Sequence, residues 1–96
     1  MRKITREAVA AFMGGYDFRS SNTEVLVSED TGAVTLFLHG NAIARRDSNG
    51  LRVSNGGWSS NTTKERLNGI PGVSVAQRNF EWFLNGRPWD GSWTLV

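Results

Sequence analysis

The chain has no cysteine, which excludes disulfide bonds, zinc–thiolate sites and thiol chemistry. It has one histidine, His39, so a zinc site would have to combine that imidazole with carboxylates, an unusual ligand set for tight binding. No apolar run approaches the roughly 20 residues of a membrane span, and the apolar run near the start is too short and broken for a signal peptide. We therefore expect a soluble intracellular protein with no cofactor and no membrane partner.

Signals of catalysis are also absent. No G-x-S-x-G nucleophile elbow occurs in the sequence, and no pair of carboxylates is predicted to converge on a pocket for acid–base chemistry. His39 stands before Gly40 at an expected strand end, where hydrogen bonding to a turn is favoured over catalysis. The sequence therefore predicts a protein that is not an enzyme.

The charge is modest, with a net value of +2, and it is unevenly distributed. Residues 24–40 carry acidic side chains and no lysine or arginine, whereas residues 41–96 have an excess of cations. Most of these cations are arginines, which suit bidentate contacts with phosphate or carboxylate. A solvated surface is the simpler explanation of such charges, and it is favoured here.

The first element expected is a short helix. Thr5 is placed at its N-cap, and Gly14–Gly15 is placed at its end. Val9, Phe12 and Met13 have the spacing of one helical face, so they are expected to be buried together.

After a polar connector at residues 16–22, the hydrophobic period changes to two, which is typical of strands. Strands are predicted over residues 23–28, 33–38, 41–46 and 51–53. Residues 33–38 form the central strand in this prediction, because both of their faces carry apolar or β-forming side chains. Asn49-Gly50 predicts a type I′ hairpin turn.

A second helix is expected over residues 61–68, followed by two strands and a tight turn at Asn85-Gly86. Phe80, Trp82 and Leu84 should share one strand face, and the tail is expected to add a short last strand with Trp89 and Trp93 packed on the sheet. With too few residues for a second core, residues 1–96 are expected to form one α+β domain. Its predicted order is a short N-terminal helix, an antiparallel β-meander, a short second helix and a C-terminal β-hairpin.

The segment GGWSSNTTKERLNG, residues 56–69, has two interpretations. Thr62 and Glu65 match a capping box at the start of the second helix. Alternatively, the free amides of the first turn hold a phosphate, with charge added by Lys64 and Arg66 on an exposed side of the helix. The spacing fails the P-loop pattern, and Glu65 would repel an anion, so the structural interpretation is favoured.

Four tryptophans are many for 96 residues. Trp82 alternates with apolar residues and is expected in the core. Trp58 lies in a Gly-Ser-rich loop and Trp89 lies beside Arg87, so these two are the preferred aromatic contacts for a partner.

The stretches LFLHGNAIARR (36–46), GWSSNTTKERLNGIPGVSV (57–75) and WFLNGRPWDG (82–91), after the leading KITREAVAAF, cover most of the chain. With them, the chain resembles a family of small proteins encoded by tailed bacteriophages and prophages. The resemblance implies a phage accessory protein in the host bacterial cytoplasm, and it implies no particular activity.

Two functions follow as hypotheses. The first is non-enzymatic nucleic-acid binding through an arginine-rich hairpin and the second helix. The second is a host-directed protein that binds and inhibits a bacterial enzyme or defence complex through a sheet edge or exposed tryptophans. The expected contact residues are Arg45, Arg46, Arg52, Trp58, Lys64, Arg66, Arg87 and Trp89. The oligomeric state is left open, since an uncovered edge strand can pair two copies.

Overall fold

Two helices and nine strands follow one another in the computed structural model, which describes residues 1–96. The helices are α1 (Lys3–Gly14) and α2 (Asn61–Asn68). One sheet contains β1 (Phe18–Ser20), β2 (Thr23–Val27), β3 (Val34–Leu38), β4 (Asn41–Asp47), β5 (Gly50–Val53) and β9 (Thr94–Leu95). A second sheet contains β6 (Val75–Arg78), β7 (Glu81–Leu84) and β8 (Arg87–Pro88). The α+β class is thereby confirmed.

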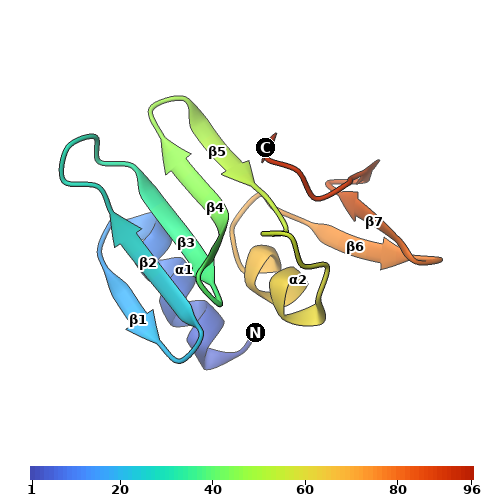
Figure 1. The fold of residues 1–96 in the computed structure, drawn as a ribbon, viewed down its shortest axis with the longest axis horizontal. Coiled ribbons are helices and arrows are strands. Elements are labelled where there is room, and N and C mark those ends of the chain that lie inside the picture. Colours follow the sequence, from blue (N-terminus) through green and yellow to red (C-terminus); the bar gives the residue numbers. More distant parts are fainter.

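The six-stranded sheet has the order β1-β2-β3-β4-β5-β9, and all of its pairs are antiparallel. Helix α1 lies behind β2 and β3 in the view of Figure 1. Alternate side chains of β3, from Val34 to Leu38, are buried on the helix side, as expected for a central strand. No helix covers the opposite face, on which Thr35 and Phe37 are partly exposed.

The three-stranded sheet extends away from this body as an arm (Figure 1). Its inner face carries Trp82 and Leu84, which are buried as expected. A single hydrophobic cluster of 17 residues includes side chains of both helices and both sheets, so the arm and the body share one core.

Three details of the N-terminal region differ from the sequence-based expectation. The helix begins after Arg2, which makes no side-chain cap, and Thr5 lies inside the helix, fully buried. Met13 is exposed, since the buried face runs through Ala8 and Ala11. The predicted connector also contains a strand, β1, which has too few apolar residues for a strand pattern.

The turns are largely those that glycine and asparagine predict. Asn85-Gly86 has two positive φ angles, of 49° and 83°, as a type I′ turn requires. The type I′ turn predicted at Asn49-Gly50 is wrong. In the β4–β5 hairpin Asp47 pairs with Gly50, so the central residues are one position earlier and only Gly50 has a positive φ.

The C-terminal region also differs in two places. Phe80 does not share the inner face of β7, because it lies at the tip of the β6–β7 hairpin and is 97% exposed. The tail does form a short last strand, but β9 pairs with β5 of the large sheet, and Trp93 is left half exposed.

Candidate interaction surfaces

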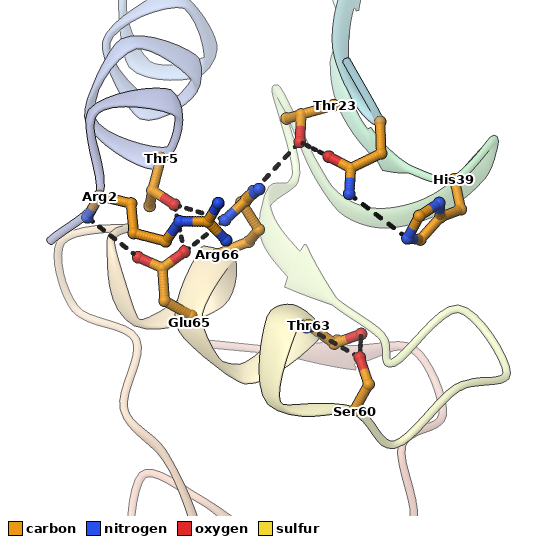
Figure 2. Close-up of polar contacts among 9 residues, drawn as sticks. Arg2, Thr5, Thr23, His39, Ser60, Thr63, Glu65 and Arg66 are labelled. Atoms are coloured by element: carbon orange, nitrogen blue, oxygen red, sulfur yellow. Dashed lines mark hydrogen bonds and ion pairs between the residues drawn. The ribbon is translucent and has the colours of Figure 1, made fainter. Parts of the chain in front are cut away.

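Arg66 is buried inside the molecule, with 1% of its surface exposed. Its Nε donates to the Thr23 hydroxyl at 3.1 Å, and its Nη1 donates to the Thr5 hydroxyl at 2.8 Å and to Glu65 (Figure 2). These bonds join α2 to α1 and β2. The expectation that Arg66 lies on an exposed side of the helix is therefore wrong.

Glu65 faces α1 and does not cap its own helix. It accepts hydrogen bonds from the Thr5 hydroxyl and the Arg2 amide, and it pairs with Arg66 (Figure 2). Burial raises the pKa of Glu65, but the hydrogen bonds from Thr5, Arg2 and Arg66 outweigh burial, so its pKa lies below the ordinary value. Glu65 is therefore held as a carboxylate at neutral pH.

Ser60, and not Thr62, is the N-cap of α2. Its hydroxyl accepts from the Thr63 amide at 3.1 Å, and the two hydroxyls lie 3.0 Å apart. The capping box predicted from Thr62 and Glu65 is wrong, because the N-cap lies two residues before Thr62 and Glu65 is turned toward α1.

Arg46 is also engaged within the fold. Its Nε donates to the Phe12 carbonyl at 2.6 Å, and its Nη2 donates to the Met13 carbonyl at 3.1 Å. These carbonyls belong to the last turn of α1, where cations are favoured by the helix dipole. Arg46 therefore closes the C-terminus of α1.

Arg45 and Arg52 lie directly opposite each other on β4 and β5. They belong to the sheet face that no helix covers, because their neighbours Ala44 and Val53 are buried on the other face. Like charges at paired positions repel. Asp47 lies between them, with Oδ2 3.4 Å from Nε of Arg45 and Oδ1 3.7 Å from Nη1 of Arg52.

The pKa of Asp47 is lowered, first by a hydrogen bond from the Asn49 amide and then by the two guanidinium groups, while desolvation opposes the shift. Asp47 is therefore ionised at neutral pH and offsets one of the two positive charges. Arg45 and Arg52 keep a net charge of +1 with Asp47, and their side chains are 49% and 38% exposed.

The two other cations among the expected contact residues, Lys64 and Arg87, lie away from the uncovered sheet face. The Lys64 ammonium is 5.9 Å from the centre of the Trp82 ring, where it makes a cation–π contact at the root of the arm. Arg87 is exposed on β8 and lines a cavity of about 860 Å³ between β7, β8 and the C-terminus. Neither adjoins the Arg45–Arg52 pair in the sheet register.

The two tryptophans differ sharply in exposure. Trp89 is buried, its ring centre lies 6.5 Å from that of Trp82, and its indole N–H donates to the Ser92 carbonyl and the Thr94 hydroxyl. Trp58 is 68% exposed. Of the two, only Trp58 offers an aromatic face to a partner.

A groove of about 470 Å³ adjoins Trp58. It lies between the β3–β4 hairpin and the loop before α2, and its apolar walls include Leu38 and Ile43. His39 lines it from the hairpin turn, with Nε2 3.4 Å from the Asn22 side-chain nitrogen. The predicted placement of His39 at a turn is confirmed, since His39-Gly40 is the two-residue turn between β3 and β4.

Among known proteins, the family model of the Kyanoviridae Gp96 protein matches residues 1–94. The chain belongs to this phage protein family. No curated protein and no solved structure matches the chain. Membership confirms the phage origin that the sequence resemblance implied.

The structure of this family member groups no three metal-ligating side chains into a candidate metal site. None of its helices is long and apolar enough to cross a membrane.

Phe80 is the feature of this family member that sequence reasoning missed. Its φ is +67°, a conformation that is rare for a bulky side chain. A signal was present: Asn79 is followed by Phe80 at the position where a type I′ turn favours glycine. An exposed aromatic ring in an unfavourable backbone conformation is a candidate contact for another protein.

Proposed function

We propose that this protein is a non-enzymatic phage accessory protein of the host bacterial cytoplasm that binds nucleic acid through the uncovered face of its large sheet. The observation that carries this proposal is the placement of Arg45 and Arg52 side by side on that face. Two guanidinium forks at neighbouring positions match the oxygen atoms of a phosphate backbone.

The same face also carries apolar groups. Leu95 of β9 pairs with Arg52, and Phe37 is partly exposed on β3, two residues after Thr35, which pairs with Arg45. An aromatic ring and guanidinium groups on one face are the combination that binds single-stranded nucleic acid, through stacking and charge. The contact set is smaller than the sequence suggested, because Arg46 and Arg66 are bonded to the fold itself.

The test is the salt dependence of binding to a labelled single-stranded oligonucleotide, with a duplex of the same sequence as comparison. We expect the affinity of the wild-type protein to fall as salt rises from 50 to 200 mM. The Arg45→Gln/Arg52→Gln variant should lower the slope of log affinity against log salt by about two.

The matched control is Lys3→Gln/Arg6→Gln, which removes two exposed cations from α1 and gives the same net charge. This control should retain most of the wild-type slope. Equal loss in both variants would indicate a general charge effect, and it would overturn the proposed face. Absence of oligonucleotide binding by the wild-type protein at 50 mM salt would overturn the function.

A second function, binding to a bacterial host enzyme or defence complex, is favoured by Phe80. The ring is 97% exposed at the tip of the β6–β7 hairpin, where it gains nothing from the protein's own core. Aromatic side chains that become buried against a partner on binding are among the residues that dominate the energetics of protein interfaces.

This second function predicts capture of one host protein from a bacterial lysate by the wild-type chain and loss of that capture by Phe80→Ser. Met13→Ser is the control, since Met13 is an exposed apolar side chain on the body and not on the arm. Capture that survives Phe80→Ser would exclude the arm as the contact.

A further inference from the structure

The loop before α2 holds the backbone of Trp58 in place while leaving its ring exposed. The Trp58 amide donates to the Asn55 carbonyl at 3.1 Å, and the Trp58 carbonyl accepts from the Thr63 hydroxyl at 3.2 Å. Asn55 also accepts from the Gly57 amide at 2.8 Å and donates to the Ser59 hydroxyl at 3.1 Å. These bonds therefore fix the backbone from which the exposed indole projects.

The same loop closes one side of the groove of about 470 Å³. That volume lies in the range of small-molecule sites. Leu38 and Ile43 line the groove but are 4% and 1% exposed, so the large exposed apolar group of the groove is the Trp58 indole, which is 68% exposed. A flat ligand in the groove can therefore stack on the indole.

Polar side chains that line the groove are free to make hydrogen bonds with a ligand. Asn41 and Thr62 line it, both are partly buried, and neither side chain makes a hydrogen bond within the chain. His39 adds an imidazole whose only contact is the long one to Asn22. The groove thus offers an amide, a hydroxyl and an imidazole, all of which can both donate and accept.

We propose that this groove binds a nucleobase, stacked on Trp58 and hydrogen-bonded at its edge by Asn41 and Thr62. A purine or pyrimidine ring has a stacking face and an edge with donors and acceptors, which matches the two kinds of group present. A purely apolar ring would leave the amide and hydroxyl unpaired, and a free phosphate would gain nothing from the indole.

The ring can come from a free nucleotide or from a nucleic-acid strand. In the second case the inference rests on the proposed function, because Arg45 and Arg52 would supply charge while the groove supplies base contact. If the ring comes from a free nucleotide, the inference does not depend on the proposed function. The two sites share no residue, so they can be removed separately.

The test is a nuclear magnetic resonance titration of the labelled protein with AMP, GMP, CMP and UMP, and with ribose 5-phosphate as the probe without a base. We expect at least one nucleotide to produce saturable shifts of the Trp58 indole N–H and of the Asn41 and Thr62 amides. Ribose 5-phosphate should leave these signals unchanged. The same titration with a single-stranded oligonucleotide of 12 nucleotides tests whether the groove binds a base that belongs to a nucleic-acid strand.

Trp58→Ala should weaken nucleobase binding about tenfold or more, while Trp58→Phe should retain most of it, since a phenyl ring still stacks. Asn41→Ala/Thr62→Val should also weaken binding and should change the preference among the four bases. Unchanged affinity in Trp58→Ala would overturn the inference, as would equal shifts with ribose 5-phosphate.

The failures of the two proposals are distinguishable. Oligonucleotide binding that depends on Arg45 and Arg52 but not on Trp58, without mononucleotide binding, overturns the groove and supports the proposed function. Mononucleotide binding in the groove without any binding of the strand supports the inference and overturns nucleic-acid binding.

Discussion

The two sheets of this protein are held in place by different means. The six-stranded body packs Val25 and Leu36 in one core with Phe12 of α1, and all three are fully buried. Arg66 adds hydrogen bonds to Thr23 and Thr5 that join α2 to β2 and α1, and it forms an ion pair with Glu65 of its own helix. The three-stranded arm has a smaller inner face, and its tip carries Phe80 in full exposure.

The side chain of Asn68, at the end of α2, connects the arm to the body by making the hydrogen bonds that a neighbouring strand would make. Its side-chain nitrogen donates to the Val75 carbonyl at 2.9 Å, and its side-chain oxygen accepts from the Val75 backbone amide at 2.6 Å. This pair occupies part of the free edge of β6 and protects it from pairing with another chain. The comparison indicates that the interactions that stabilise the fold are concentrated in the body, whereas the arm carries an exposed contact group, Phe80.

The largest expected effect is on the body. Arg66→Met leaves Glu65 and the Thr5 and Thr23 hydroxyls without their buried partner, so we expect a loss of about 3–5 kcal/mol in the free energy of unfolding. Urea unfolding measures it. Lys64→Met, on the same helix but partly exposed, should cost less than about 1 kcal/mol. Equal losses would show that the buried network contributes little.

A smaller effect is expected where the arm joins α2. Asn68→Ala removes both hydrogen bonds to Val75, at about 1 kcal/mol each. Hydrogen exchange should show faster exchange of β6 and β7 amides, with β3 amides unchanged. Uniform acceleration in both sheets would mean that arm and body unfold as one unit.

Phe80→Gly should stabilise the protein by about 1 kcal/mol, because glycine adopts a φ of +67° without the steric cost paid by Phe80. Thermal unfolding measures this as a rise in Tm. Leu26→Gly is the control: Leu26 is an exposed apolar residue within β2, outside the positive-φ region, and its replacement should lower Tm. A fall in Tm for Phe80→Gly would show that the ring packs on the arm.

The smallest expected effect is on pH dependence. Because the pKa of Glu65 is lower in the folded protein than its ordinary value of 4.5, its contribution to stability is complete above pH 4.5 and is lost as pH falls through the lowered pKa. Unfolding by urea at pH 6 and at pH 3 should show a larger loss for the wild-type protein than for Glu65→Gln. Parallel losses would remove Glu65 from the acid sensitivity of the body.

Sequence reasoning succeeded where a structure depends on neighbouring residues. The bounds of α2, residues 61–68, follow from its polar start and its end at Asn68-Gly69, and the Asn85-Gly86 turn follows from the φ preferences of that pair. It failed for Arg66, although a signal existed. Arg66 has the i+3 spacing from Thr63 and adjoins Leu67, so it belongs to the buried stripe of the helix.

The sequence indicates which residue types are candidate contacts, but it does not indicate which of these side chains are exposed. Trp58 lies between Gly57 and Ser59, and Trp89 follows Arg87 by two residues, yet Trp58 is exposed and Trp89 is buried. Trp89 is buried because β9 returns to the large sheet and brings Thr94 to its indole N–H. No local pattern in the tail indicates which sheet accepts that strand.

The sequence by itself determined the α+β class, the main hairpins and the phage family, since periodicity, turn residues and motif order are local properties. Only the tertiary structure decided which cations are free. Arg66 bonds to residues 43 and 61 positions earlier in the chain, and Arg46 bonds to carbonyls 34 and 33 positions earlier. Such partners meet only when the core closes, because a charged side chain turns inward where the packed fold supplies enough acceptors to replace water.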